Sequence, residues 1–253
     1  MTNSNCVAYL NREDTLHPRL WNHSCHVLKK VNQALKSILE SDLVRFHPSD
    51  ELSVLDFGCG DRPYEPWFQE KRMQYIAADV RNNLLADIHF DTNRPIPIES
   101  DSINIVFSTS VLEHVRDVEG YLSECYRVLK SDGVLILSAP GFWTWHGYPD
   151  DFYRWTFQGM HAVIEQANFK VEKMTPCVGP LAYTTHLRNQ LLRGVLYKLT
   201  PISWPVIGLL NIFSSLLMPL EDAITPKTVL EQNAVMHVLA ARKVKVDMSV
   251  ETD

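Results

Sequence analysis

Ser53-Val-Leu-Asp-Phe-Gly-Cys-Gly-Asp61 is an apolar run that breaks into Asp56, Gly58 and Gly60. Its apolar part is short and β-compatible, as expected for the first strand of a parallel sheet that is covered on both faces. The glycines allow a tight turn and let the backbone approach a bound molecule, which a Cβ atom would prevent. The stretch therefore predicts a buried strand that leads into a ligand-binding loop.

The residues around this loop narrow the choice of ligand. A dinucleotide fingerprint would require a third glycine where Pro63 stands, which argues against NAD. A second apolar run, residues 74–78, is closed by Asp79, which lies 21 residues beyond Gly58. Nucleotide-binding α/β folds place a carboxylate at about this spacing to accept both hydroxyls of a ribose. Asp79 is therefore the expected ribose ligand.

The later segments follow in a definite order. They are the runs at residues 90–92, 95–98, 102–108 and 111–115, a helix expected over 118–130, and a strand over 134–138 after Asp132-Gly133. This series resembles the class I S-adenosylmethionine-dependent methyltransferases, in the small-molecule branch called type 11. The resemblance covers about residues 52–169. It rests on the acidic-glycine loop, the second-strand Asp79 and the segment Leu112-Glu-His…Arg127-Val-Leu-Lys-x-Asp-Gly133.

The resemblance implies a Rossmann-like, seven-stranded α/β sheet with helices on both faces and a helical insertion before the last strand. It also implies S-adenosyl-L-methionine as cofactor and S-adenosyl-L-homocysteine as product. The expected cofactor-binding residues are Asp56, Gly58, Cys59, Gly60, Asp79, Val80, Asp91, Thr92 and Ser108. Within this set, Asp91 would approach the adenine amino group and Ser108 would close the pocket. Two positions depart from the family: Arg62 replaces a third glycine, and Asn104 replaces a common acidic residue.

Composition limits the class of protein. The chain has 253 residues, which is enough to bury a full core. A net charge of −6 argues against sequence-independent binding of nucleic acid, because such binding requires a concentrated basic face. We expect an N-terminal helical extension (1–45), a methyltransferase core (46–178), a helical hydrophobic insertion (179–232), and a last core strand with a polar tail (233–253).

Cysteine usage indicates a reducing compartment. The five cysteines are scattered and form no CxxC pair, so neither a disulfide framework nor a zinc site is expected. The group His23-x-Cys25-His26 has no further ligand pair nearby, and no metal site is predicted. Residues 1–11 contain no signal segment, which favours a cytoplasmic protein.

Periodicity predicts most of the remaining elements. Apolar residues from 20 to 40 form one helical stripe, and this helix is expected to pack beside the first strand. Residues 156–167 are expected to be helical. Residues 169–175 and 234–242 read as the closing strands of the sheet.

An aromatic loop follows the fifth expected strand, over residues 139–156. Loops at the carboxyl ends of strands are where α/β enzymes build substrate sites. The expected acceptor-binding residues are Trp143, Trp145, Tyr153 and Arg154. The loop also resembles glycan and cell-envelope methyltransferases in the pattern His146-x-x-Pro149-x-Asp151-x-x-Arg154-x-Thr156. This resemblance implies a sugar-like acceptor.

Methyl transfer to a hydroxyl requires a group within reach of the proton that is lost. The candidates for this base are His146, Asp150, Asp151 and His114, with Glu113 and His114 equally open to a structural role. The leading hypothesis is O-methylation of a small molecule, a glycan or a lipid-linked acceptor. Alternatives are an inactive partner protein that keeps the cofactor site, and a nucleotide-dependent oxidoreductase, which Pro63 disfavours.

Residues 199–220 contain no charge and place apolar side chains at helical spacing. Prolines 201, 205 and 219 are expected to confine a clean helix to 206–218, which is short for a membrane span. Three readings remain open. The segment could cap the acceptor pocket, form a homodimer interface, or lie on the inner face of the membrane with Arg188, Arg193 and Lys198 toward the headgroups.

Overall fold

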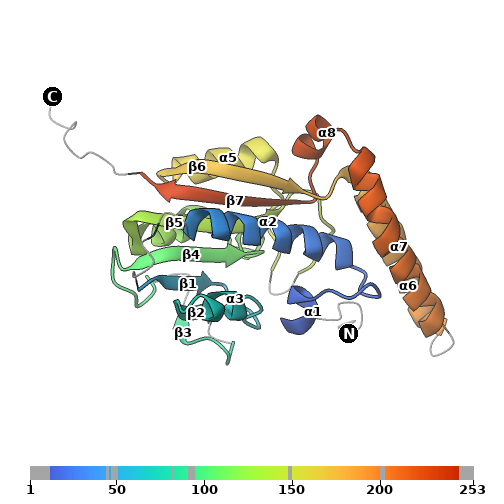
Figure 1. Ribbon diagram of the computed structural model, residues 1–253, viewed down its shortest axis with the longest axis horizontal. Coiled ribbons are helices and arrows are strands. Elements are labelled where there is room, and N and C mark those ends of the chain that lie inside the picture. The colour runs from blue at the N-terminus through green and yellow to red at the C-terminus, as the bar shows by residue number, and fades with distance from the viewer. Residues whose placement is uncertain are drawn as a thin grey trace.

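The computed structural model describes residues 12–43, 46, 51–80, 83–90, 95–147, 150–199 and 203–244. Its centre is a seven-stranded sheet in the order β3-β2-β1-β4-β5-β7-β6 (Figure 1). The strands are β1 (Ser53–Phe57), β2 (Gln74–Val80), β3 (Ile88–Phe90), β4 (Ile103–Thr109), β5 (Leu129–Pro140), β6 (Phe169–Cys177) and β7 (Met236–Lys243). Strand β7 runs antiparallel to β5 and β6, and the other pairs are parallel. The α/β sheet expected from the sequence is confirmed.

The two central strands, β1 and β4, supply both faces of the core because strand side chains alternate in direction. Val54, Ile105 and Phe107 point into one apolar cluster. Leu55 and Val106 point into the cluster on the opposite face. Residues 53–57 are buried throughout, so neither face of β1 is open to water.

Helices cover both faces of this sheet. They are α1 (Arg12–Leu16), α2 (Cys25–Leu43), α3 (Glu65–Glu70), the short 3₁₀ turns η1 (Leu112–His114) and η2 (Tyr197–Leu199), α4 (Val118–Val128), α5 (Phe157–Gln166), α6 (Pro180–Leu196), α7 (Trp204–Ile224) and α8 (Lys227–Gln232). Leu35 of α2 packs in the first cluster, whereas Leu122 of α4 and Ile164 of α5 pack in the second. Side-chain caps start α4 and α5, because Asp117 accepts from Gly120 N and Thr156 accepts from Gly159 N.

The prediction for the helix over residues 20–40 is wrong in two respects: the helix begins later than expected, and it packs on other strands. Residues 20–24 form turns, in which the Asn22 side chain accepts a hydrogen bond from the backbone N of Ser24 at 2.9 Å. Helix α2 then lies across β5, β6 and β7, not beside β1 (Figure 1). The N-terminal helix therefore covers the half of the sheet that contains the antiparallel strand.

The helix expected to reach residue 130 ends at Val128. Leu129 adopts extended backbone and begins β5, where it pairs with Ile103. A Cβ at Gly133 would lie 2.8 Å from the Leu129 side chain and 3.0 Å from the Lys130 carbonyl. The segment between helix and strand is therefore part of the sheet, with a register shift where a turn was expected.

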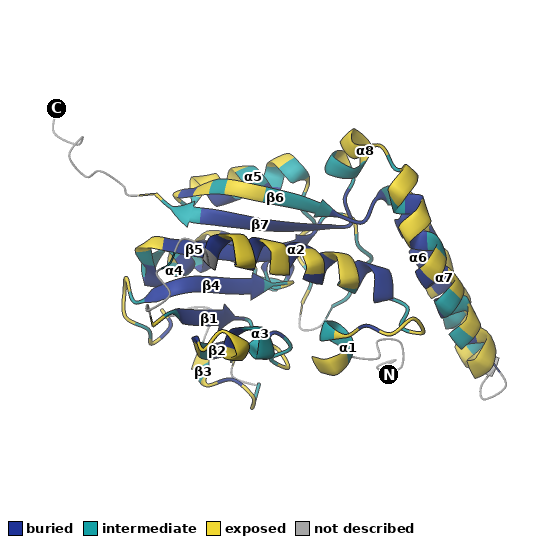
Figure 2. Cartoon of the chain, viewed as in Figure 1, coloured by how far each residue is buried: buried dark blue, intermediate teal, exposed yellow. Residues whose placement is uncertain are grey.

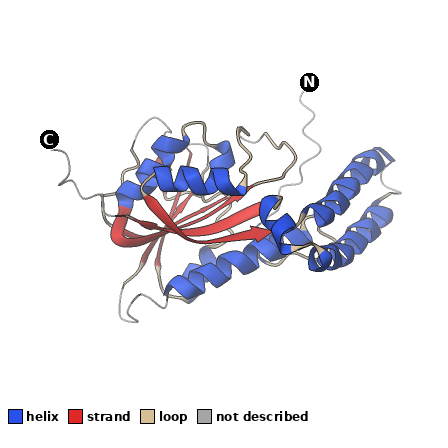
Figure 3. Ribbon diagram, turned by 90° about the horizontal axis from the view of Figure 1, so that it is seen from above, coloured by secondary structure: helices blue, strands red, loops and turns tan. Residues whose placement is uncertain are grey.

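Helices α6, α7 and α8 lie between β6 and β7 in the chain. Helices α6 and α7 form a hairpin that projects from one end of the sheet (Figures 1 and 3). Helix α7 is longer than the expected 206–218: Pro205 stands in the first turn, where its missing N–H is not needed, and the helix continues through Pro219. Beyond Pro219, the Glu221 side chain accepts from Thr185 at 2.7 Å, which holds the last turns in place.

Candidate active site

Four parallel strands place their loops along one edge of the sheet. Strands β2, β1, β4 and β5 are neighbours and run in the same direction. The loops that follow their carboxyl ends therefore meet at that edge, which is where open α/β sheets bind ligands. The glycine loop, Asp79, the Glu113–His114 turn and the aromatic loop all belong to this edge.

The glycine loop needs glycine at its first position. Gly58 has φ +90° and Gly60 has φ +50°, a region that side chains disfavour. A Cβ at Gly58 would lie 2.4 Å from the Val111 side chain, in the segment after β4. The backbone N atoms of Gly58 and Cys59 both donate to the Ala78 carbonyl, at 2.8 and 3.1 Å. Gly58 thus allows the loops after β1 and β4 to touch.

Arg62, which replaces a family glycine, keeps a left-handed backbone with φ +55°. Its guanidinium donates to Asp87 at 3.0 Å and to Glu65 at 2.9 Å, and it lies 5.2 Å from the centre of the Tyr75 ring. These contacts fasten the loop to β2 and to the start of α3. The departure from the family pattern therefore leaves the turn intact and adds a side-chain anchor.

A pocket of about 200 Å³ lies against this loop. Its lining residues are Arg12, Thr15, Gly58, Cys59, Gly60, Asp61, Pro63, Thr109 and Ser110. Gly58, Cys59 and Gly60 thus line a pocket, and their expected contact with the cofactor stays a prediction. The contribution of α1 was not anticipated, because nothing in its short polar sequence indicates a partner.

Ser108 must be corrected as a pocket residue. It is fully buried, and its hydroxyl lies 2.7 Å from the Tyr121 hydroxyl on α4. Tyr121 in turn donates to the Phe57 carbonyl at 2.9 Å. Strand alternation points Ser108 away from the pocket, so its neighbours Thr109 and Ser110 line the wall instead.

Asp79 lies at the end of β2 and faces the glycine loop. Its Oδ2 atom accepts from Gly60 N at 2.9 Å and from Asn83 Nδ2 at 2.7 Å, and its Oδ1 atom accepts from Val80 N at 2.7 Å. A carboxylate has about four lone-pair sites, so acceptor capacity remains for a ligand. Asn83 was missed by sequence reasoning, while Asp91 and Thr92 lie outside the described residues.

Asp56 lies behind the loop. Its carboxyl is buried and accepts a short hydrogen bond from the Tyr75 hydroxyl. Burial raises the pKa of Asp56 to about 7, although the bond from Tyr75 acts in the opposite direction. Asp56 is not among the residues that line the pocket, so its expected contact with the methionine part of a cofactor stays a prediction.

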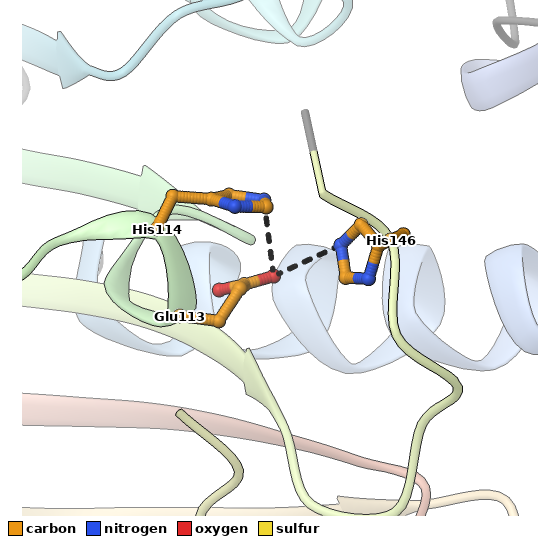
Figure 4. A group of neighbouring side chains, drawn as sticks. All are labelled: Glu113, His114 and His146. Atoms are coloured by element: carbon orange, nitrogen blue, oxygen red, sulfur yellow. Dashed lines mark ion pairs between the residues drawn. The ribbon is translucent and has the colours of Figure 1, made fainter. Parts of the chain in front are cut away.

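Two imidazoles and one carboxyl converge beside the loop (Figure 4). The Oε1 atom of Glu113 lies 3.9 Å from Nε2 of His114 and 4.0 Å from Nε2 of His146. The Glu113 side chain is 1% exposed, and burial raises its pKa to about 8. Its Oε2 atom has no hydrogen-bond partner among the described residues. Glu113 is therefore a central member of the site, although the sequence ranked it below its neighbours.

The aromatic loop docks directly on this turn. Phe152 N donates to the Glu113 carbonyl at 2.8 Å, and His114 Nδ1 makes a short contact with the carbonyl of Asp150. The rings of His114 and His146 meet edge to face, with centroids 5.0 Å apart. The structure thus brings His114 and His146 together and uses the backbone, not the carboxylate, of Asp150 in this contact.

Asp151 and Arg154 hold the loop together. The Asp151 side chain is 1% exposed, accepts from His146 N at 2.9 Å and receives both terminal nitrogens of Arg154. Arg154 also donates to the carbonyls of Trp143 and Thr144. Burial alone would raise the pKa of Asp151, but the bonds from Arg154 and His146 N hold it below its usual value. The expected roles of base for Asp151 and acceptor anchor for Arg154 are replaced by a positioning role.

The other aromatic candidates have different surroundings. Trp143 stacks on Tyr183 of α6, with centroids 5.7 Å apart. Tyr153 is 37% exposed and its hydroxyl donates to the Arg116 carbonyl. Trp145 is 78% exposed, more than any other aromatic side chain among the described residues of this loop. Their contact with an acceptor stays a prediction.

Glu113, His114 and His146 could also hold a divalent cation, since their ligand atoms all lie within 4.8 Å of one another. Imidazole and carboxylate suit zinc, iron or manganese. The earlier group near residue 25 is dispersed instead: His23 stacks on His186, Cys25 donates to the Pro18 carbonyl, and His26 lies 2.6 Å from Asp222. The cysteines among the described residues are free thiols.

Comparisons with known proteins agree with this geometry. Residues 55–137 match the protein family described as "Methyltransferase domain". A probable S-adenosylmethionine-dependent methyltransferase of Mycolicibacterium smegmatis is 33% identical over 69 residues, which are 27% of this chain and 24% of that protein. A ubiquinone biosynthesis O-methyltransferase of Cereibacter sphaeroides is 27% identical over 125 residues, which are 44% of this chain and 51% of that protein.

A solved structure extends the likeness to most of the fold. A putative sarcosine dimethylglycine methyltransferase from Galdieria sulphuraria has a TM-score of 0.53 at 14% identity, covering 85% of this chain and 86% of that one. At this identity the likeness shows the fold alone. In sequence, the chain spans about a quarter and about half of the length of the two relatives above.

Proposed function

We propose that this chain, which belongs to the class I S-adenosylmethionine-dependent methyltransferases through its domain at residues 55–137, methylates a hydroxyl oxygen of a small molecule, a glycan or a lipid-linked acceptor. One observation carries the proposal. The glycine loop touches Val111, and two residues further on Glu113 meets His114 and His146. A cofactor pocket and a group that can accept a proton therefore share one edge of the sheet.

The residues at the pocket fit the cofactor of this family. Gly58 and Gly60 leave the backbone open to a ligand. Asp79 accepts three hydrogen bonds within the chain and so retains about one of its four lone-pair sites for a ribose hydroxyl; a bond to the second hydroxyl would replace a present donor such as Asn83. Thr109 and Ser110 also line this pocket. When bound there, S-adenosylmethionine supplies an electrophilic methyl group on a sulfonium centre.

The chain itself contributes positioning, exclusion of water and a proton acceptor. Burial lowers the pKa of His146, which keeps its imidazole neutral at physiological pH. A neutral Nε2 atom can accept the proton of an acceptor hydroxyl. The Asp151 carboxylate fixes the backbone of His146, and Arg154 fixes Asp151. We assign His146 as the base, with His114 and Glu113 beside it.

A hydroxylated, sugar-like acceptor suits the aromatic loop. Trp145 is largely exposed and Tyr153 is partly exposed, so aromatic surface is available next to polar groups. Ligand sites commonly combine such apolar walls with a few placed polar groups. The O-methyltransferase among the relatives also favours oxygen over nitrogen or carbon as the methylated atom.

The test separates transfer from binding alone. Purified protein is titrated with S-adenosylmethionine in a calorimeter and then incubated with methyl-labelled cofactor and fractionated cell extract. We expect binding and a labelled, base-stable ether in the product. Binding without transfer to any fraction would indicate a cofactor-binding partner protein. A labelled amine or carbon would contradict the assignment to oxygen.

A further inference from the structure

Many residues of α6 and α7 are exposed (Figure 2), and several of them are large and apolar. Leu209 is 68% exposed, Phe213 is 62% exposed and Leu220 is 65% exposed. We call this surface the hairpin face and define it by Leu191, Val195, Leu209, Phe213, Leu216 and Leu220. Leu209, Phe213, Leu216 and Leu220 recur at helical spacing and therefore lie on one side of α7. Exposed apolar surface of this kind marks a contact site.

The polar side of α7 faces inward. Asn211 is buried, accepts from Asn189 of α6 at 3.0 Å and donates to the Trp21 carbonyl at 2.7 Å. Ser215 donates to the Leu20 carbonyl at 2.8 Å. A helix on a water-facing surface shows the opposite arrangement, with its apolar stripe inward. Hydrogen-bonded polar pairs between helices, with apolar residues outside, suit a hairpin whose outer surroundings are apolar.

The charge of the hairpin differs from that of the chain. The hairpin, residues 180–224, contains Arg188, Arg193 and Lys198 together with Glu221 and Asp222, which gives +1. The two acidic side chains lie at the base of the hairpin, where Glu221 accepts from Thr185 and Asp222 pairs with His26, whereas Arg188 and Lys198 are exposed. The whole chain has a net charge of −6, so the remaining residues carry −7. Cationic side chains beside an apolar face attract anionic lipid headgroups. A symmetric dimer through the same face would place two like-charged hairpins together.

We propose that the hairpin face docks this protein on the surface of an anionic phospholipid bilayer. The outer side chains of α7 would enter the boundary between headgroups and acyl chains. Tyr197 and Trp204 lie at the tip, 42% and 64% exposed, and such amphipathic rings favour this boundary. The membrane is thereby the proposed occupant of the hairpin face, which corresponds to one of the three readings that the sequence left open.

The hairpin lies on the bilayer and does not cross it. Helix α7 has 21 residues and is long and apolar enough to span by length and composition. However, its inner side is bonded to the body through Asn211 and Ser215. At its end, Asp222 Oδ1 accepts from Gly179 N at 2.7 Å and Oδ2 pairs with His26 at 2.6 Å. These contacts leave only the outer side of α7 free for lipid.

The hairpin is also connected to the acceptor loop. Trp143 stacks on Tyr183 and meets His186, both near the start of α6. A hairpin seated on a membrane would therefore place the aromatic loop close to that surface. If the proposed methyl transfer holds, this geometry favours an acceptor with a lipid anchor over a freely diffusing one.

The test is co-sedimentation of the full chain with vesicles. One set contains phosphatidylcholine with phosphatidylglycerol, and the other contains phosphatidylcholine alone. We expect binding to the anionic vesicles, reduced by salt because charges at the surface are screened. The double variant Leu209→Asp with Phe213→Asp should lower the bound fraction about tenfold or more, since charge is unfavourable in the interfacial region.

The matched control is Leu84→Asp, a leucine that is 92% exposed and lies outside the hairpin. It should bind vesicles like the wild type, and circular dichroism should show that all variants are folded. The proposal is overturned if the wild type stays in solution at low salt, or if the double variant binds unchanged. It is also overturned if the double variant only converts a dimer to a monomer in sedimentation velocity. Methyl transfer is not measured, so failure here leaves the proposed function standing.

Discussion

Arg154 grips the buried carboxylate of Asp151 with both terminal nitrogens, at 2.5 and 2.6 Å. Both residues were expected to contact an acceptor or its proton. They instead set the path of the loop, because Arg154 also binds two loop carbonyls and Asp151 holds His146 N. Ionisable side chains of an active-site loop can thus stabilise the conformation of that loop.

Replacing Arg154 by Gln should destabilise the protein by about 1–3 kcal/mol, because a buried carboxylate loses its partner. Arg154→Lys should recover only part of this, since an ammonium cannot form the two-pronged contact. Urea unfolding measures the effect. The control Lys227→Gln removes an exposed pair with Glu231 and should change little. Equal stability of the Arg154→Gln and Lys227→Gln variants would contradict the positioning role.

Asp79→Ala should weaken binding of S-adenosylmethionine about a hundredfold or more. Each hydrogen bond to a charged group contributes about 1.5–3 kcal/mol, and two are expected from the ribose. Calorimetric titration measures the change. Asp101→Ala, which removes a surface carboxylate bonded to Lys243, serves as the control. Unchanged affinity in Asp79→Ala would reject this placement of the cofactor.

His146→Gln should lower the rate of transfer about 10²–10⁴-fold while cofactor affinity stays the same. Because burial lowers the pKa of His146, the wild-type rate should fall only below the ordinary histidine pKa of about 6.5. The variant should lose this acidic limb. His161→Gln, on α5, is the control.

Transfer should also persist when EDTA removes divalent cations. A loss of transfer that an added divalent cation restores would assign the cluster of Glu113, His114 and His146 to metal binding.

Asp56 should make stability depend on pH. Burial raises its pKa in the folded state to about 7, above the value near 3.9 in the unfolded chain. Its contribution is therefore fully present below pH of about 4 and is lost as pH rises through 7. Between pH 5 and pH 8 the free energy of unfolding should fall more steeply in the wild type than in Asp56→Asn. Parallel curves from urea unfolding would show that Asp56 is not buried in this way.

The sequence by itself determined the sheet and the cofactor loop. The run from Ser53 to Asp61 combines a short, β-compatible apolar segment with glycines that allow a tight turn, so strand and turn follow from local chemistry. The same holds for Asp79, whose spacing is fixed by one strand-turn-helix-strand unit. Prediction from the sequence failed where strand pairing overrode the local helical preference. Leu129 continues a helical pattern, yet pairing with Ile103 makes it a strand residue.

Only the tertiary structure decided what the ionisable side chains do. Glu113 comes from the turn after β4, whereas His146 and Asp151 come from the aromatic loop after β5, and their burial and pKa values depend on how these two segments pack. The hairpin shows the same limit. Periodicity revealed that α7 has an apolar and a polar side, but not which side faces the protein. That choice depends on Asn189, which donates to Asn211, and on the carbonyls of Trp21 and Leu20, which accept from Asn211 and Ser215. These groups come from other segments of the chain.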